Sequence, residues 1–224
     1  MRGLFSFQFA GLSKDGLPQV VNTEGNVTTT DINFQDYDED NLRNNLVYSG
    51  NVDPTDVGSF GNIFKYKNLT LNVFITYSFG NVVRLDPVYS NEYDDLVSLP
   101  KEFNNRWVVP GDESRTSVPV IASKLQNDLD ANLSYAYSAY NYSTERIAKG
   151  DFIRMKEISI GYEFPKSITS ALRVNNLSLK LQGTNLFLLY ADKKLNGQDP
   201  EFFNTGGVAV PMAKQFTLTL KLGL

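Results

Sequence analysis

Two carboxylates, Asp199 and Glu201, are the residues whose types and spacing come nearest to catalytic chemistry in this chain. A pair of carboxyl groups can hydrolyse a glycosidic bond when the two groups flank that bond at a controlled separation. With only Pro200 between them on a turn, these two have no such control, so a structural turn is the better interpretation. The chain has no histidine, which removes the usual general base and excludes a Ser-His-Asp hydrolase. We therefore expect no catalytic residue and no enzyme.

Metal and cofactor chemistry also lacks its usual residues. The absence of cysteine and histidine removes disulfides, thiolate catalysis and the common zinc sites. An acidic run offers oxygen ligands of the kind that Ca²⁺ prefers, and it consists of Asp36, Asp38, Glu39 and Asp40. The glycine that an EF-hand loop needs is missing, so a solvated acidic loop is favoured over a calcium site. We expect no cofactor and no metal.

Aromatic side chains are the remaining candidates for ligand binding. Tyrosine and tryptophan combine a flat apolar face with a polar tip, which suits sugar rings, peptides or a partner protein. The candidates for contact with a ligand or a lid protein are Trp107, Tyr135, Tyr137, Tyr140 and Tyr142. For the tyrosines, packing within the long loop or contact with a partner protein is favoured over a ligand platform, and for Trp107 a role as the packing anchor of its loop is favoured.

The elements that would position these residues are β-strands. At the C-terminus Phe216, Leu218, Leu220, Leu222 and Leu224 alternate with polar or small residues, which places one set on each face of a strand. Large apolar residues on one face and polar residues on the other are typical of a membrane barrel strand. Five further segments carry the same signal, at residues 4–10, 60–66, 69–79, 152–164 and 177–190. Lys67-Asn68 is a turn-sized gap, which predicts a hairpin between the second and third of these segments.

The connections between the predicted strands alternate between long and short. Residues 11–59, 81–151 and 191–213 are long connections, whereas residues 67–68 and 165–176 are short. Outer-membrane barrels have short periplasmic turns and long extracellular loops, together with aromatic girdles at both interfaces. Predicted periplasmic girdle residues are Tyr66, Tyr162 and Phe164, and predicted outer ones are Tyr77, Phe79, Phe187, Tyr190 and Phe216.

Composition excludes several other classes of protein. No run approaches the 18 or more apolar residues of a spanning helix, which excludes a helical membrane protein. The net charge of −4 and the lack of a Lys/Arg cluster argue against nucleic acid as a partner. About six strands are too few to close a membrane barrel, and open edges are not tolerated in lipid. We therefore expect an incomplete barrel that is either one part of an oligomer or, as favoured here, part of a longer chain carrying the export signal.

Four stretches, taken in order, resemble the SusC/RagA-type TonB-linked outer-membrane proteins of Bacteroidetes. Residues 150–165, Gly-Asp-Phe-Ile-Arg-Met-Lys-Glu-Ile-Ser-Ile-Gly-Tyr-Glu-Phe-Pro, closely resemble the signature of the penultimate hairpin of that family. The other matching stretches are residues 66–71 (Tyr-Lys-Asn-Leu-Thr-Leu) with 79–81 (Phe-Gly-Asn), residues 183–187 (Gly-Thr-Asn-Leu-Phe), and residues 199–201 (Asp-Pro-Glu) followed by the terminal strand. The resemblance extends over nearly the whole chain, from Phe5 onward.

The resemblance implies an all-β fold in which residues 1–224 are the C-terminal portion of a transmembrane β-barrel, without the plug domain. It also implies location in the cell outer membrane of a Gram-negative bacterium of Bacteroidetes type. The implied partners are the lipid bilayer, a SusD-like surface lipoprotein, TonB through an N-terminal region absent here, and an oligosaccharide or peptide cargo. One departure is the terminal Leu224, where such barrels usually end on an aromatic residue.

Two other functions stay open on the residues alone. A secreted carbohydrate-binding β-sandwich would show the same alternation, with two sheets packed face to face. A passive porin would show the same strands and loops, and only the family resemblance implies active import. The length pattern of the connections and the resemblance favour the importer.

Overall fold

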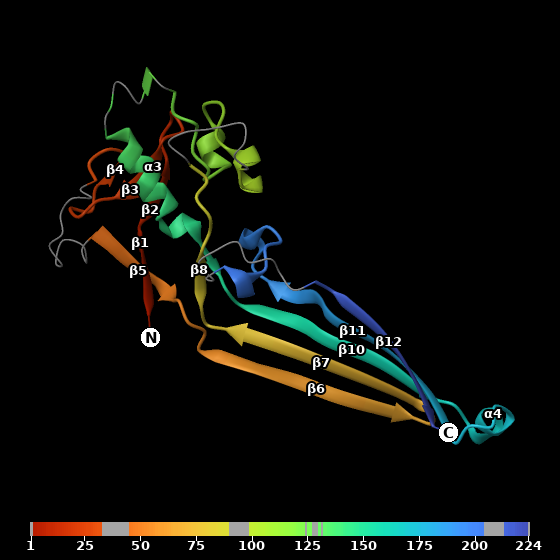
Figure 1. Ribbon diagram of the computed structural model, residues 1–224. Helices are drawn as coiled ribbons and strands as arrows, with labels where there is room; N and C mark the ends of the chain where they lie inside the picture. Colours follow the sequence, from red (N-terminus) through yellow and green to blue (C-terminus); the bar gives the residue numbers. More distant parts are fainter. Residues whose placement is uncertain are drawn as a thin grey trace. The chain divides into compact units, whose positions relative to one another are not determined.

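The computed structural model describes residues 2–32, 45–89, 99–123, 125–126, 130, 132–203 and 213–223. The chain divides into two compact units. The loop unit comprises Met1–Asp53, Val82–Ala148 and Lys193–Gln198, and the sheet unit comprises Pro54–Asn81, Lys149–Asp192 and Asp199–Leu224. Each unit is assembled from three segments of the chain, so neither could have been delimited as a continuous stretch of sequence (Figure 1).

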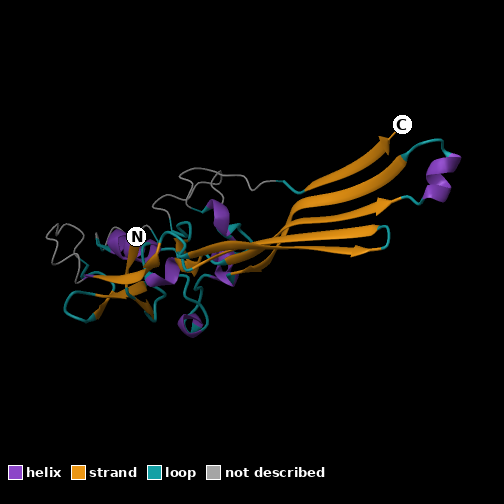
Figure 2. Cartoon of the chain, turned by 90° about the horizontal axis from the view of Figure 1, so that it is seen from below, coloured by secondary structure: helices purple, strands orange, loops and turns teal. Residues whose placement is uncertain are grey.

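The sheet unit is a five-stranded antiparallel sheet with the order β12-β11-β10-β7-β6 (Figures 1 and 2). Its strands are β6 (Asp56–Tyr66), β7 (Leu69–Phe79), β10 (Phe152–Glu163), β11 (Asn176–Ala191) and β12 (Gln215–Gly223). Each strand therefore pairs with the next strand of the sheet along the chain, which is the meander of an up-and-down antiparallel architecture. The predicted hairpin at Lys67-Asn68 is confirmed, with Tyr66 paired to Leu69.

Irregularities in two strands keep the apolar residues on one face. In β10 the register shifts between Met155 and Glu157, so that Ile153 and Met155 before the shift share a face with Ile158 after it. In β11 the matching shift surrounds Asn185, whose φ of 52° lies in the left-handed region that asparagine tolerates. Without these bulges, a strict period of two would turn half of each strand's apolar residues to the opposite face.

Two short helices lie in the connections of the sheet unit. The predicted short connection between β10 and β11 contains α4 (Lys166–Ala171), which begins directly after Pro165. Proline is tolerated at a helix start because the first N–H groups of a helix have no partner within it. A 3-10 helix, η5 (Pro200–Phe202), lies between β11 and β12, and the Asp199 side chain caps it by accepting from the Glu201 N–H.

Small sheets and short helices make up the described part of the loop unit. Its strands are β1 (Gly3–Phe7), β2 (Phe9–Leu12), β3 (Pro18–Val21), β4 (Val27–Thr28), β5 (Leu46–Asn51), β8 (Val82–Arg84) and β9 (Ile147–Lys149). They form the pairs β1-β5 and β8-β9 and the three-stranded sheet β2-β3-β4. The helices are α3 (Leu133–Asn141) and the 3-10 turns η1 (Lys101–Asn105), η2 (Asp112–Ser114), η3 (Thr144–Arg146) and η4 (Lys193–Leu195).

The core of the loop unit forms on the buried side of α3. Leu133, Ala136, Tyr137 and Tyr140 are spaced by one and two turns, so their side chains share one face of the helix. Tyr137 stacks on Tyr89 with ring centroids 4.0 Å apart. Tyr137 and Tyr140 are among the largest fully buried side chains, and each belongs to a different apolar cluster, so one short helix contributes to both clusters of this unit.

The first predicted strand, residues 4–10, does not belong to the large sheet. It divides at Gln8 into β1 and β2, which pair with β5 and β3 inside the loop unit. The Gln8 carbonyl accepts from the Val21 N–H, and the Phe9 N–H donates to the Thr144 hydroxyl, so the backbone at the division is paired with the loop unit. The expectation of about six strands in one sheet is therefore wrong for this segment, and the sheet has five strands among the described residues.

None of the helices in the described ranges combines the length and the apolar character needed to cross a membrane.

Candidate functional site

One face of the sheet unit is apolar and exposed. Cross-strand pairs such as Leu71 with Ile160, Ile160 with Leu181, and Leu181 with Leu218 put the apolar residues of neighbouring strands side by side. The large exposed side chains on this face, here called the apolar face, are Phe60, Phe64, Tyr66, Leu69, Ile160, Tyr162, Leu179, Leu181, Phe187, Tyr190, Phe216, Leu218, Leu220 and Leu222. Phe216 and Leu218 are 73% and 68% exposed. A contiguous apolar surface of this kind marks an interaction surface for lipid or another apolar partner.

The opposite face of the sheet, here called the polar face, carries mostly hydroxyl, amide and charged side chains. Asn72 on β7 donates through Nδ2 to Glu157 Oε1 on β10, at 3.1 Å. A hollow of about 320 Å³ on this face is lined in part by Thr70, Ser159, Lys180 and Lys221. The two faces therefore differ sharply in polarity, as the alternation in the sequence predicted.

Aromatic rings gather at the two ends of the sheet. Tyr162 and Phe164 meet edge to face with centroids 5.2 Å apart at the end that carries the Lys67-Asn68 turn, and Tyr77 stacks on Phe79 at the other end. Such rings suit the interface between lipid and water, because one part of the ring is apolar and another is wet.

The prediction that Phe216 belongs to the outer aromatic girdle is wrong. It pairs with Gly183, whose other neighbour Ile158 pairs with Val73 in the middle of β7. Phe216 thus lies at mid-height of the sheet, since β12 has only nine residues and begins level with the centre of the longer strands. A Cβ at position 183 would come within 2.9 Å of the Leu186 side chain and 3.4 Å of the Phe216 ring, so the glycine leaves room for Leu186 first and for the ring beside it.

The four stretches that resemble the SusC/RagA family converge on β10. At one end of the strand the Gly80 N–H donates to Asp151 Oδ1 at 2.7 Å, and at the other end Asn68 Nδ2 donates to the Glu163 carbonyl at 2.7 Å. The stretch 183–187 supplies the bulge opposite Met155 and Glu157. Each of these motifs therefore fixes either a turn next to β10 or the register of its pairing.

The carboxylates of Asp199 and Glu201 bind an arginine instead of flanking an open cleft. Arg154 on β10 donates through Nη2 to Asp199 Oδ1 and Oδ2 at 2.5 and 2.6 Å, and Glu201 Oε2 lies 3.3 Å from the same nitrogen. The side chains of Arg154 and Asp199 are largely buried. This supports the structural interpretation of the Asp-Pro-Glu turn: it attaches the connection before β12 to the polar face. The sequence gives no sign that Arg154 is the partner, because 45 residues separate it from Asp199.

Three of the five aromatic candidates are buried in the loop unit. Tyr137 and Tyr140 are 0% exposed, and Trp107 is 8% exposed. The Tyr137 hydroxyl donates to the Val120 carbonyl at 2.5 Å, and the Trp107 Nε1–H donates to Glu113 Oε2 at 3.0 Å. Burial raises the pKa of the Tyr140 hydroxyl, because the charged phenolate is disfavoured away from water. These three side chains are anchors of the fold in this structure.

The other two candidates, Tyr135 and Tyr142, are exposed. They occupy the first turn of α3 and its C-terminal cap. Arg84 lies over the Tyr142 ring at 5.2 Å from its centroid, so one face of that ring is covered by a cation. The structure therefore does not bring the five candidates together into one platform.

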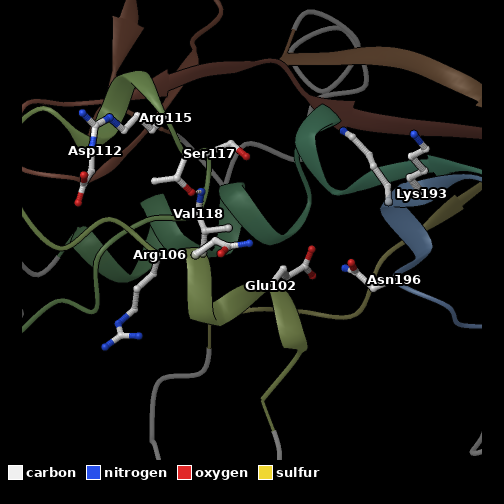
Figure 3. A pocket seen from close by; sticks show the side chains of 11 residues that line it. Glu102, Arg106, Asp112, Arg115, Ser117, Val118, Lys193 and Asn196 are labelled. Atoms are coloured by element: carbon white, nitrogen blue, oxygen red, sulfur yellow. Dashed lines mark hydrogen bonds between the residues drawn. The ribbon is translucent and has the colours of Figure 1, made fainter.

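A second feature of the loop unit was not found from the sequence. A cavity of about 590 Å³ is lined by residues from η1, η2, the segment after η2, and η4 (Figure 3). Its charged side chains are Glu102, Arg106, Asp112, Arg115, Lys193 and Lys194. They lie up to 92 positions apart in the chain, as from Glu102 to Lys194, so no local motif reveals them.

In the part of the chain that the structure describes, no group of three or more His, Cys, Asp or Glu side chains is placed to hold a metal ion. The acidic run from Asp36 to Asp40 lies outside the described residues.

Sequence comparison identifies one curated relative and no matching family model. TonB-dependent receptor P39 of Formosa agariphila is 27% identical over 190 residues, which cover 81% of this chain and 17% of that protein. The chain is a relative of the SusC/RagA-type TonB-dependent receptors. The resemblance read from the four stretches is thereby confirmed.

Comparison with solved structures shows that this chain shares its fold with part of the RagAB peptide transporter. Against one structure of that transporter the TM-score is 0.67 at 20% identity, over 98% of this chain and 22% of the other. Against the importer in its closed-closed state the TM-score is 0.64 at 22% identity, over 97% of this chain and 22% of the other. The chain thus spans about a fifth of the length of the proteins that it matches.

Proposed function

We propose that the sheet unit is a section of the wall of an outer-membrane β-barrel in a TonB-dependent importer, and that the loop unit supplies extracellular loops. The observation that carries the proposal is the two-faced sheet, with an exposed apolar face and a polar face across five consecutive strands. Strands β6 and β7 have eleven residues each, close to the roughly 9–11 residues that a tilted strand needs to span a bilayer.

The apolar face would contact lipid and the polar face would line the lumen. Because unpaired strand edges are not viable in hydrocarbon, β6 and β12 would pair with further strands of the barrel. The side chains of the polar face would tune the interior, and we propose no covalent chemistry and no enzymatic activity for this chain.

The proposed partners follow from the resemblance and from the names of the relatives. We propose a SusD-like surface lipoprotein above the barrel, TonB as the source of energy through a region outside these 224 residues, and an oligosaccharide or a peptide as cargo. The name of the curated relative supports dependence on TonB, and the RagAB structures support import. The exposed Tyr135 and Tyr142 remain the candidates for contact with cargo or with the lid lipoprotein.

The β-sandwich alternative is less well supported. A sandwich packs a second sheet on the apolar face of the first. In the described part of the sheet unit, the apolar face is exposed along all five strands instead.

Site-directed spin labelling tests the proposal directly, because the chain has no cysteine and needs no background substitution. Leu218→Cys and Leu220→Cys place a nitroxide on the apolar face of β12, and Thr217→Cys and Thr219→Cys are matched controls on the polar face. In lipid vesicles, we expect the label at 218 and 220 to be accessible to oxygen dissolved in the bilayer. The label at 217 and 219 should be accessible to a water-soluble nickel complex.

Equal access of both quenchers at all four positions would contradict the proposed wall. A monodisperse chain that melts cooperatively in plain buffer, without detergent or lipid, would also contradict it and favour the sandwich.

A further inference from the structure

The helix α4 carries an exposed apolar pair, at the end of the sheet that also carries the Lys67-Asn68 turn (Figure 1). Ile168 and Leu172 are 41% and 57% exposed. They lie four positions apart, with Leu172 at the C-terminal cap of the helix, so their side chains are neighbours on one flank. A turn that meets only water gains nothing from two large apolar side chains side by side. This flank therefore indicates contact with an apolar phase.

The other sides of α4 differ from this flank. Thr169 is buried, whereas Ser167 and Ser170 are exposed. With 3.6 residues per turn, the two serines lie on the side of the helix away from the apolar pair. The helix thus has a side against the protein, an apolar flank and a polar side. This division is typical of a short helix that lies in the plane of a membrane surface.

Hydrogen bonds fix both ends of the connection that contains α4 to the ends of the strands. The Phe164 N–H donates to the Leu177 carbonyl at 2.9 Å, and the Asn175 N–H donates to the Gly223 carbonyl at 2.7 Å. Phe164 also belongs to the pair of rings with Tyr162 at this end of the sheet. The helix begins two residues after Phe164, so it lies next to the level at which the proposed lipid surface meets water.

The same end of the sheet is basic on the turns. Lys67, Lys166 and Arg173 are exposed, and none of them forms an ion pair with any residue that the structure describes. The turn at residues 66–69 and the connection at residues 164–176 contain no aspartate or glutamate. The whole chain has a net charge of −4. A locally positive region on an acidic chain attracts anionic groups to that place.

One cation of this region already lies beside an aromatic ring of the apolar face. The Lys67 Nζ is 5.3 Å from the centroid of the exposed Tyr66 ring. Lysine and arginine can pack their apolar stems along such a surface while the charged head reaches the headgroup layer. Phosphate oxygens form charge-assisted hydrogen bonds with ammonium and guanidinium groups. Apolar side chains and cations thus occur together, as a phospholipid requires.

We propose that α4 and the Lys67-Asn68 turn bind anionic phospholipid at the turn end of the sheet. Ile168 and Leu172 insert among the acyl chains, and Lys166 and Arg173 contact the phosphate groups. The proposal rests on the proposed function, because the sheet unit must lie in a bilayer for α4 to reach the lipid. It adds a lipid contact outside the strands, in a connection that is otherwise expected to lie in water.

Spin labels on α4 test its insertion. Ile168→Cys and Leu172→Cys label the apolar flank, and Ser167→Cys and Ser170→Cys are matched controls on the polar side. The full chain is placed in vesicles of phosphatidylcholine and phosphatidylglycerol. We expect the ratio of accessibility to oxygen over accessibility to a neutral nickel complex to be severalfold higher at 168 and 172 than at 167 and 170.

The charge of the lipid tests the contact with the headgroup. The label at 168 should give two spectral components, docked and undocked, and docking should weaken in vesicles of phosphatidylcholine alone. Lys166→Gln and Arg173→Gln should each lower the ratio of docked to undocked label about fivefold in the anionic vesicles. Lys65→Gln is the matched control, an exposed cation that pairs with Thr70 on the polar face, and it should leave the ratio unchanged.

Three outcomes would overturn the proposal. The first is equal access of the nickel complex at all four positions of α4, and the second is the same docking with and without anionic lipid. The third is protection of 168 and 172 from both quenchers, which would assign the apolar flank to a protein partner.

The labels on β12 distinguish this failure from that of the proposed function. Oxygen access at 218 and 220 combined with nickel access at 168 and 172 would refute the docking of α4 and leave the barrel wall in place. Equal access of both quenchers at 217–220 would refute the wall, whatever the labels on α4 show.

Discussion

Replacing Arg146 should destabilise the loop unit more than any other single loss of charge in that unit. The Arg146 side chain is 2% exposed, and its Nη2 donates to Glu102 Oε1 at 2.6 Å and to the Asp86 carbonyl at 2.5 Å. Its guanidinium also lies 6.0 Å from the centroid of the Tyr140 ring. In Arg146→Met, the Glu102 carboxylate and the Asp86 carbonyl lose their donor while most of the apolar volume is kept.

The expected size follows from the burial of the two partners. Breaking a buried ion pair by removing one partner costs about 3–5 kcal/mol. The Glu102 side chain is 19% exposed, so water partly solvates the carboxylate that Arg146→Met leaves unpaired. We therefore expect a loss at the lower end of this range, about 3 kcal/mol of unfolding free energy. With a urea dependence of about 2 kcal/mol per M, the unfolding midpoint should fall by roughly 1.5 M.

Trp107 makes the assay specific to the loop unit, because it is the sole tryptophan of the chain. Urea unfolding in detergent, followed by its fluorescence, reports this unit alone. Arg115→Met is the matched control: an exposed arginine of the same unit without an ion pair, which should shift stability by less than about 0.5 kcal/mol. Glu102→Gln on top of Arg146→Met should recover part of the loss, since it removes the uncompensated charge.

A midpoint in Arg146→Met within about 0.3 M of the unsubstituted chain would correspond to well under 1 kcal/mol and would refute the argument. So would an equal shift in Arg115→Met, because the effect would then not come from burial of the pair.

Gly16→Ala should lower the free energy of unfolding of the loop unit by at least about 1–2 kcal/mol, the cost of a left-handed backbone at a residue other than glycine. Gly16 has φ 76°, and a Cβ at this position would also overlap the Trp107 ring. The same fluorescence assay measures the loss, and an unchanged unfolding midpoint would contradict the prediction. For pH, hydrogen bonds from the Val109 and Val108 N–H groups lower the pKa of Asp112, so the carboxylate contributes stability above its ordinary pKa and loses it as the pH falls through the lowered pKa. NMR titration should give a pKa for Asp112 below the usual aspartate range, and acid unfolding of Asp112→Asn should lack this contribution; a pKa in the usual range would contradict the assignment.

The five strands of the sheet could be predicted from the sequence because each strand has two faces that meet different surroundings. The alternation over residues 69–79 and 215–223 indicates which residues share a face of the sheet. Lys67-Asn68 indicates the turn between one strand and the next. Residues 4–10 alternate equally well, yet they form β1 and β2 in the loop unit. A period of two identifies a strand but does not identify its partner, since pairing is decided by segments far away in the chain.

The aromatic candidates illustrate the same limit at the level of single residues. Tyr135, Tyr137, Tyr140 and Tyr142 are close in sequence, and a helix of 3.6 residues per turn separates them into a buried pair and an exposed pair. The sequence offered all four as candidates because it gave no sign of α3 in a long polar connection. The helix itself is stabilised by tertiary contacts such as the stacking of Tyr89 on Tyr137.

The sequence by itself determined the chemical limits of this protein and the polarity of its sheet. The lack of histidine and cysteine and the alternation of side chains are properties of residue type and spacing, which folding does not alter. Tertiary structure alone decided the pairing of Arg154 with Asp199 and the gathering of charged side chains from η1, η2 and η4 in the lining of one cavity. The physical reason is that charges attract or repel across space, and only the fold sets which charges become neighbours.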